Sequence, residues 1–395
     1  MTDSATHPSS RAKDFDHHDP ALAPRVFEEY AELRSECPVG WSEKHEGFWV
    51  VTDWRSIHDL ARDPERLSSG VSLIPNMMGD NVLIPISLDP PEHSKYRGIL
   101  QRWFTPARVG TFEPFIRSRC RELLEALESP ADLAWEYARP LPLDVILNVL
   151  GVPDRDMEVV AAGARAVIEL AGVDPMEAFA KIEEAYGYLA GELVPELRAR
   201  PGDDLISFLA GAEIDGEPMT EQTIASIAFN VIGAGFDTTY KSIATSIAFL
   251  AAHPEHQHTL RTTADLPVAV EELLRLFAPV SAGRQVTEDF EWDGVRLSAG
   301  DAVLLAYPAA GRDPAVFGDP DAPDFARQPN KHLTFGAGIH RCLGMHLARL
   351  EMIVALDELF AATSSFELEV GHEATLCQGQ VWGATSVPVQ FTRAD

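Results

Sequence analysis

The chain has 395 residues, of which 61 are acidic and 32 are lysine or arginine, giving a formal net charge of -29 at pH 7. An acidic excess of this size argues against binding to nucleic acid or to anionic membrane surfaces. The apolar content of 46% is enough for a large core. The four cysteines contain no Cys-x-x-Cys pair, and the sequence shows neither a signal peptide nor a membrane-spanning segment, so we expect a cytoplasmic protein.

Hydrophobic spacing divides the chain into many helices and a few short strands. We expect residues 1–20 to form a flexible N-terminal tail and residues 21–395 to form a single domain. Apolar residues at three- and four-residue steps predict helices over residues 25–37, 54–62, 93–104, 112–127, 143–150, 154–170, 175–198, 205–210, 220–252 and 266–277, and from residue 343 onward. Runs of β-branched and aromatic residues predict strands over residues 48–52, 285–289, 291–297, 302–306, 366–370 and 387–391. The fold class is therefore mainly α with small β-sheets.

A long irregular stretch, residues 68–90, combines prolines and glycines with apolar side chains such as Met77, Val82 and Leu83. Long loops in compact domains are often lids or binding loops. A plain surface connection is the alternative, but it fits poorly with so many apolar residues. We therefore expect this loop to face a substrate.

The predicted helix over residues 220–252 carries a single charge, Asp237, between Glu221 and Lys241. A lone carboxylate in an apolar helix is unfavourable unless it is paired or functional. Gly235 is a poor helix former and Thr238 can bond back to a carbonyl, so we expect a local distortion here. These residues alone allow two interpretations equally: a buried polar cluster whose groups are all hydrogen-bonded, or an acid with a function.

The most informative stretch is residues 335–349, where Cys342 stands in a glycine-rich loop directly before an amphipathic helix. A helix N-terminus favours a thiolate over a thiol, and a thiolate suits a soft metal or haem iron. A buried structural cysteine is the simplest alternative. A zinc site built from His340, Cys342 and His346 is disfavoured because no fourth ligand is near.

The pattern Phe335-x-x-Gly338-x-His340-x-Cys342-x-Gly344 resembles the haem-binding loop of the cytochrome P450 family. The resemblance implies the cytochrome P450 fold, with haem b (iron protoporphyrin IX) between a long central helix and the helix after the cysteine. It implies that the haem iron is bound by Cys342 and that O2 is a co-substrate. The remaining residues that it places beside the cofactor are Phe335, Gly336, Ala234 and Gly235.

Three further segments match the family. Residues 234–239 resemble its oxygen-activation motif, which implies that Asp237 and Thr238 relay protons during catalysis. Glu272-x-x-Arg275 resembles its structural Glu-x-x-Arg pair, whose third partner is left open between Arg312 and Arg327. The resemblance also implies that the two haem propionates bind cationic or donor groups, namely His93, Arg97, Arg284 and His340.

The activity implied is monooxygenation, the insertion of one oxygen atom from O2 into a C–H bond. We expect a monomer that receives electrons from a ferredoxin and a ferredoxin reductase, because no reductase is fused to the chain. A basic docking patch for that partner would comprise Arg102, Arg108, Arg341 and Arg349.

The sequence contains little information about the identity of the substrate. Residues 84–92 and 294–304 are similar to the camphor-hydroxylase branch of the family, although Asn81 stands where that branch has a ketone-binding tyrosine. We therefore expect a small apolar, terpenoid-like substrate other than camphor. The expected pocket residues are Met77, Asn81, Val82, Leu83, Phe229, Ala234, Val280, Gln380 and Val381.

Two other functions remain open. A haem-thiolate peroxygenase or an oxidative-coupling enzyme would keep the fold and change the chemistry, but the complete Asp237–Thr238 pair favours O2 cleavage. A non-catalytic haem sensor or carrier is a second alternative, disfavoured because the sequence shows no additional signalling domain.

Overall fold

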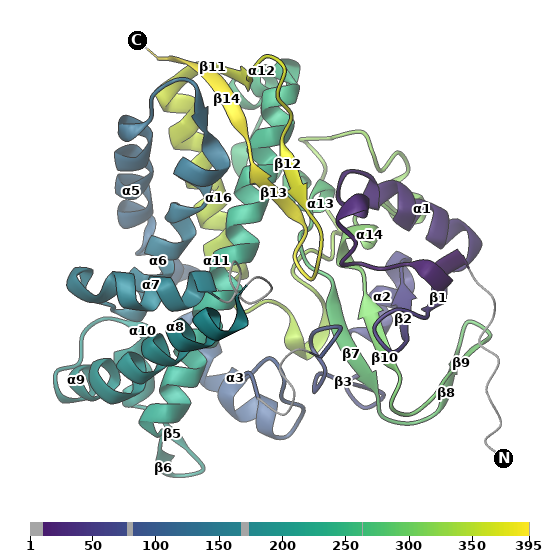
Figure 1. Ribbon diagram of the computed structural model, residues 1–395, viewed down its shortest axis with the longest axis horizontal. Coiled ribbons are helices and arrows are strands. Elements are labelled where there is room, and N and C mark those ends of the chain that lie inside the picture. Colours follow the sequence, from purple (N-terminus) through teal and green to yellow (C-terminus); the bar gives the residue numbers. More distant parts are fainter. Residues whose placement is uncertain (1–10, 77–81, 167–173, 263, 395) are drawn as a thin grey trace.

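The structure is a computed structural model that describes residues 11–76, 82–166, 174–262 and 264–394. Helices gather on one side of the molecule and the largest sheet lies on the other, as Figure 1 shows. The α-helices are α1 (Val26–Glu36), α2 (Trp54–Leu60), α3 (Glu92–Trp103), α4 (Pro106–Gly110), α5 (Glu113–Ala126), α6 (Pro140–Leu150), α7 (Met157–Arg165), α8 (Pro175–Tyr188), α9 (Val194–Ala199), α10 (Leu205–Ala210), α11 (Glu221–Ala252), α12 (Pro254–Thr262), α13 (Leu266–Leu276), α14 (Tyr307–Ala310), α15 (Pro314–Phe317) and α16 (Met345–Ala362). The predicted mainly α class with small sheets is confirmed.

The strands are short and form five separate sheets. They are β1 (Val39–Ser42), β2 (Phe48–Val51), β3 (Leu67–Ser68), β4 (Ala131–Asp132), β5 (Glu213–Ile214), β6 (Glu217–Pro218), β7 (Ala282–Val286), β8 (Phe290–Trp292), β9 (Val295–Leu297), β10 (Ala302–Leu305), β11 (Thr363–Leu368), β12 (Thr375–Cys377), β13 (Gly383–Ser386) and β14 (Pro388–Arg393). The largest sheet has the order β1-β2-β10-β7-β3. In it, β10 runs parallel to β2 and antiparallel to β7. This sheet carries Arg284 on its β7 strand.

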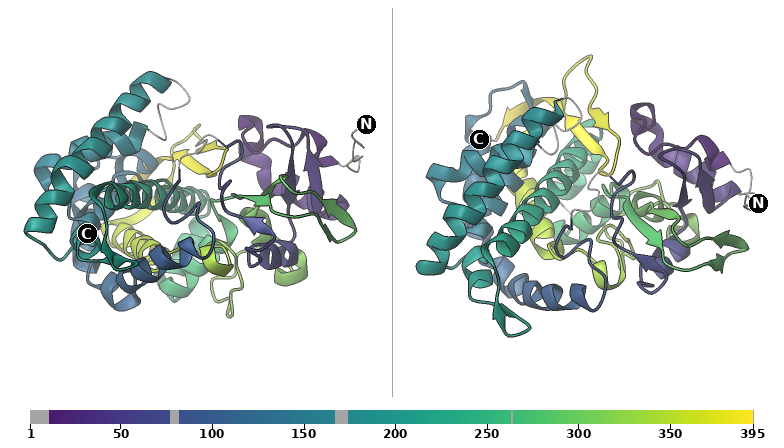
Figure 2. Two further views of the ribbon diagram at one scale, coloured as in Figure 1. Left: turned by 90° about the horizontal axis from the view of Figure 1, so that it is seen from below. Right: turned by 60° about the horizontal axis from the view of Figure 1, so that its bottom comes forward.

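Helix α11 runs through the core of the molecule. It begins where the side chain of Thr220 accepts a hydrogen bond from the Thr223 N–H at 3.1 Å, as expected of an N-cap. It packs against α6, α16 and β13, and Figure 2 shows α11 and α16 side by side. The prediction of a local distortion is wrong, because α11 is α-helical throughout. The Thr238 hydroxyl donates to the Ala234 carbonyl at 2.8 Å without breaking the helix.

The N-terminal segment differs from the sequence expectation. Residues 11–20, expected to belong to a flexible tail, instead pack on the sheet side of the molecule, where Ala12, Phe15 and His17 are buried. Two 3-10 helices, Arg11–Asp14 and Pro20–Arg25, frame this segment. Residues 1–10 lie outside the described residues. Among the described residues, no helix is long and apolar enough to cross a membrane.

Candidate functional site

Cys342 lies in a tight loop that leads into α16. Its backbone N–H donates to the Phe335 carbonyl at 2.8 Å, which closes the loop. Gly336 and Gly338 have φ values of 70° and 72°, a region that favours glycine. A Cβ atom at Gly338 would also collide with the backbone of Ala61, so the close approach of the loop to α2 requires glycine there.

Cys342 is an exposed residue, yet many protein atoms surround its thiol. Burial raises the pKa of its thiol, although the Gly344 N–H and the Arg97 guanidinium act in the opposite direction. The helix end and the nearby cations therefore favour a thiolate as predicted, but burial outweighs them in the free thiol. A metal ion bound to the sulfur would supply the missing positive charge, because a coordinating thiol is deprotonated.

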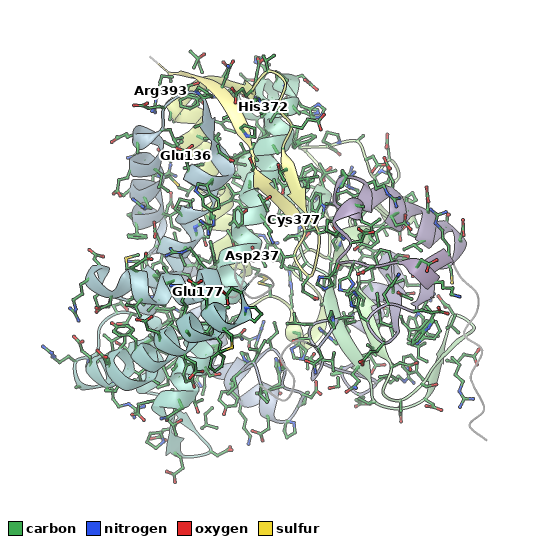
Figure 3. The ribbon with its side chains drawn as sticks, viewed as in Figure 1. Glu136, Glu177, Asp237, His372, Cys377 and Arg393 are labelled. Carbon is green, nitrogen blue, oxygen red and sulfur yellow. The ribbon has the colours of Figure 1, made fainter. Side chains whose placement is uncertain are left out.

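The middle of α11 combines an exposed alanine with a buried acid. Ala234 is exposed, whereas Phe236 and Asp237 next to it are buried. One carboxylate oxygen of Asp237, Oδ2, accepts a hydrogen bond from the Lys241 ammonium at 2.9 Å. The other oxygen, Oδ1, is buried and has no hydrogen-bond partner in the described part of the chain. Figure 3 shows Asp237 in the central part of the molecule, where α11 passes β13.

Lys241 is a partner that the sequence reasoning missed. It lies four residues after Asp237, which is the spacing of ion pairs on a helix face. Its ammonium also donates to the Val381 carbonyl at 3.2 Å, so it links α11 to the segment before β13. Gly383 allows this contact, because a Cβ atom there would come within 2.7 Å of the Lys241 side chain.

Four cationic or donor residues converge near the cysteine loop. His93 and Arg97 come from α3, Arg284 from β7 and His340 from the loop itself. The rings of His93 and His340 lie with their centroids 4.3 Å apart. Burial, followed by Arg284, His93 and Arg97, lowers the pKa of His340 to about 3. The structure thus brings together the four residues that the sequence singled out.

These four residues have polar atoms with few partners. The Nε2 atoms of His93 and His340 and the Nε atom of Arg97 are buried without a hydrogen-bond partner among the described residues. Arg97 donates only to the Arg341 carbonyl, and Arg284 donates to the Gly283 carbonyl, so neither is paired with a carboxylate of the described residues. A ligand with two carboxylates would satisfy such a set of donors.

Glu272 and Arg275 form a fully buried pair on α13, and both have 0% side-chain exposure. The Arg275 guanidinium donates to both oxygens of Glu272, at 2.8 and 2.7 Å. The third partner is Arg327, whose Nε donates to Glu272 at 3.1 Å. Arg312 instead binds the Leu276 carbonyl and Asp321. The choice that the sequence left open is therefore settled in the structure by geometry.

The residues expected to line a substrate pocket fall into three groups. Met77 and Asn81 lie outside the described residues. Val82 is 51% exposed, and the loop near it is tied to α11 by a 3.0 Å bond from the Asn230 amide to the Ile84 carbonyl. The remaining residues are half-buried or lie on α11, and they are Leu83, Phe229, Ala234, Val280, Gln380 and Val381.

Three of these residues come together directly. Val280 and Val381 face each other in an antiparallel bridge. The Gln380 amide donates to the Ser281 carbonyl, and its Oε1 is buried without a partner in the described ranges. Phe229, in contrast, lies on the part of α11 that faces Gly163 of α7.

Two of the four arginines expected to form a docking patch are engaged in other contacts. Arg108 pairs with Asp203 at 2.7 Å and lies over the Trp103 ring. Arg349 pairs with Glu271, which His332 also contacts at 2.9 Å. Arg102 and Arg341 are exposed.

Glu271 and Glu351 are further acids that the sequence analysis did not single out. Burial works against ionisation of Glu271, but bonds from His332 and Arg349 outweigh it and lower its pKa to about 2. On α16, Oε2 of Glu351 is buried with no hydrogen-bond partner among the described residues, and burial raises the pKa of this carboxyl well above its usual value. The spacing of apolar residues, on which the helix predictions depend, did not indicate that either acid has an unusual environment.

Comparison with known proteins agrees with this architecture. The family model described as Cytochrome P450 matches residues 181–382. The mycinamicin IV hydroxylase/epoxidase of Micromonospora griseorubida is 35% identical over 358 residues, which cover 86% of this chain and 89% of that protein. Cytochrome P450-terp of a Pseudomonas species is 31% identical over 404 residues, covering 93% of this chain and 94% of that protein.

A solved structure supports the same assignment. The crystal structure of CYP108D1 from Novosphingobium aromaticivorans matches with a TM-score of 0.86 and 30% identity, covering 95% of this chain and 96% of that one. The fold and the sequence matches define the class: the chain belongs to the cytochrome P450 family, and it is a bacterial cytochrome P450. It is accordingly a monooxygenase, an enzyme of a family that uses haem and O2.

The residues present fit a haem. A haem needs an axial ligand and partners for two propionates. The structure offers the open thiol of Cys342 together with the buried, unpartnered donor atoms of His93, Arg97 and His340. The donor set therefore matches the group that the family implies.

Proposed function

We propose that this cytochrome P450 binds haem b between α11 and the cysteine loop and hydroxylates a compact, mostly apolar, terpenoid-like molecule. In this proposal Cys342 would hold the iron through its sulfur, and His93, Arg97, Arg284 and His340 would bind the propionates. Phe335, Gly336, Ala234 and Gly235 contact the cofactor. The observation that carries the proposal is the set of buried nitrogen atoms around the exposed Cys342 that have no hydrogen-bond partner in the part of the chain that the structure describes.

The bound haem would supply O2 binding and the oxidising power for C–H cleavage, which no protein side chain has. The thiolate of Cys342 would donate electron density to the iron. Asp237 and Thr238 would deliver protons. Oδ1 of Asp237 is the oxygen that would take part in this relay, because Lys241 occupies only Oδ2. The Thr238 hydroxyl lies one helical turn from Ala234, an exposed residue in the middle of α11.

The expected substrate follows from the side chains that would surround it. Leu83, Val280 and Val381 are apolar and half-buried, and the unpartnered Oε1 of Gln380 could accept a hydrogen bond from one hydroxyl group. Together with Met77, Asn81, Val82, Phe229 and Ala234 they make the proposed pocket. The names of the relatives refer to different substrates, among them mycinamicin IV and methyl-branched lipids, so the proposal of a terpenoid rests on the pocket side chains and not on the relatives.

We infer that electrons come from a ferredoxin and its reductase, which would dock beside the exposed Arg102 and Arg341. The packed N-terminal segment from residue 11 and the rest of the chain would act as a single domain in a cytoplasmic monomer. The brace formed by Glu272, Arg275 and Arg327 would have a structural role.

The reduced protein treated with carbon monoxide tests the haem assignment. We expect the red-shifted Soret band that a thiolate ligand produces, and its loss in Cys342→Ser. Cys37→Ser is the control, because Cys37 lies at the end of α1 and bonds to the Val39 carbonyl. A colourless protein, or an unchanged spectrum in Cys342→Ser, would contradict the proposal.

Substrate and reaction type need separate measurements. A panel of terpenoids, fatty acids and macrolides is scored by the shift of the iron from low spin to high spin. Shifts with fatty acids or macrolides alone would overturn the terpenoid assignment. Turnover with NADPH, a ferredoxin and a reductase, compared with H2O2 alone, distinguishes a monooxygenase from a peroxygenase.

A further inference from the structure

A cluster of histidines and one carboxylate lies outside the site described above. Asp16 and His17 belong to the N-terminal segment, between the two 3-10 helices, and His45 lies in the turn between β1 and β2. One ligand atom from each of these three residues lies within 4.8 Å of the others. Asp16 Oδ1 and His45 Nε2 are already 2.7 Å apart.

His17 has an unusual environment for a histidine. Its side chain is 0% exposed, and neither ring nitrogen has a hydrogen-bond partner within the described ranges. The nearby Ile74 carbonyl already accepts a hydrogen bond from His18 Nε2 at 2.8 Å. Buried polar atoms are nearly always paired, so an unpaired imidazole inside a group of ligand-type side chains points to a missing partner.

The protonation state of His17 suits metal binding. Burial, followed by repulsion from His18, lowers its pKa to about 3, so the ring is neutral at physiological pH. A neutral imidazole has a free lone pair, which is the form that binds metal ions. The rings of His18 and Phe48 pack against it, with centroids 4.3 and 5.4 Å away, and restrict its orientation.

The backbone holds His45 in place. His45 and Glu46 have φ values of 50° and 69°, which non-glycine residues adopt uncommonly. The N-terminal segment is also fastened to this hairpin directly, because Ser42 Oγ donates to the Phe15 carbonyl at 2.6 Å. The three ligand-type side chains are therefore presented by two segments that are already fixed to each other.

We propose that Asp16, His17 and His45 bind a divalent transition-metal ion, with Zn²⁺ as the best match. Two imidazole nitrogens and one carboxylate oxygen are ordinary zinc ligands, and water would complete a tetrahedral set. The proton that His45 Nε2 shares with Asp16 would move to Nδ1, which leaves the Nε2 lone pair free for the ion. The ion would hold the N-terminal segment against the β1–β2 turn.

A second cluster provides an internal control. His253, Glu255 and His256 also place ligand atoms within 4.8 Å of one another. Their side chains are more open to solvent, and none of their ring nitrogens is a buried atom without a partner. We expect this group to bind zinc only weakly.

The test is the zinc content of the purified holoprotein after treatment with a chelator, reloading with Zn²⁺ and gel filtration. Zinc is normalised to protein, so the result does not depend on the haem assignment. We expect about one zinc per chain and a rise in the unfolding temperature that chelator reverses. His45→Asn should abolish both, and Asp16→Asn should weaken both.

The variants are chosen so that loss of binding is not loss of folding. Asparagine tolerates the positive φ of position 45, and asparagine at position 16 keeps an oxygen that can accept the His18 N–H. His256→Ala is the control and should retain full zinc content. Wild-type protein without stoichiometric zinc, or zinc lost in His256→Ala and kept in His45→Asn, would overturn the proposal.

Discussion

Two buried carboxylates in this molecule have opposite environments. Glu272 on α13 accepts five hydrogen bonds, two from Arg275 and one each from the Asp324 N–H, Arg327 and Asn330. Asp237 on α11 accepts one, from Lys241, and keeps Oδ1 without a partner in the described part of the chain.

The difference separates a structural acid from a reactive one. Burial alone would raise the pKa of Glu272, but the bonds from Arg275 and Asp324 outweigh it and lower that pKa. Both oxygens of the Glu272 carboxylate are occupied by hydrogen bonds. Oδ1 of Asp237, in contrast, has no hydrogen-bond partner among the described residues, as the proposed proton relay requires. We infer that the number of partners, and not burial, distinguishes the two roles.

The largest expected effect comes from removing the charge of Glu272, the carboxylate that accepts five hydrogen bonds. Glu272→Gln leaves the Arg275 guanidinium buried without a countercharge, and losing one partner of a buried pair costs about 3–5 kcal/mol. Urea unfolding of the holoprotein measures the free energy of unfolding. Glu271→Gln is the control, because Glu271 is 27% exposed and should lose less stability. A loss in Glu272→Gln no larger than in Glu271→Gln would refute the structural role.

The second effect concerns turnover more than stability. Asp237→Asn keeps the shape of the side chain and removes its ability to donate and recover protons, so we expect a fall in turnover of about 10²-fold or more. The spectrum of the carbon monoxide complex should remain close to that of the wild type. The free energy of unfolding should fall, because the buried Lys241 ammonium loses its countercharge, but by less than in Glu272→Gln, because asparagine still offers an oxygen to that ammonium.

Asp204→Asn is the matched control for that variant. Asp204 is a buried helical acid too, but it caps α10 by accepting from the Ser207 N–H at 2.7 Å, and asparagine is also a good N-cap. Equal loss of turnover in the two variants would show that Asp237 has no special part in the reaction.

The sequence predicted the two acids but not the difference between them. The spacing of Glu272 and Arg275 indicated that they share a helix face, and the same spacing rule applied to Asp237 would have found Lys241. The other partners of Glu272 come from residues 324–330, a segment without regular structure, whose position no periodicity encodes. Tertiary contacts of irregular segments are therefore what the sequence could not supply.

The same limit explains the errors elsewhere. Helix α11, and the strand β2 with its aromatic and β-branched residues, were predicted to within a residue or so of their ends. The N-terminal segment was expected to be a tail because it is polar, yet Phe15 and His17 are buried by contacts with the sheet side of the molecule. At Gly311, just after α14, a Cβ atom would collide with the Arg275 carbonyl, so the packing here requires glycine, and no pattern in the sequence indicates this contact.

The smallest expected effect comes from replacing Arg327, one of the several hydrogen-bond partners of Glu272. Arg327→Lys keeps the charge but loses the planar guanidinium, and Glu272 retains its bonds from Arg275, the Asp324 N–H and Asn330. We therefore expect a loss of about 1 kcal/mol in the free energy of unfolding, with turnover unchanged. Steady-state turnover and urea unfolding on the same preparation check both parts. The opposite result would be a fall in turnover as large as in Asp237→Asn with an unchanged free energy of unfolding. It would mean that Glu272 takes part in the reaction although both of its oxygens are occupied by hydrogen bonds. The number of hydrogen-bond partners would then not distinguish Glu272 from Asp237.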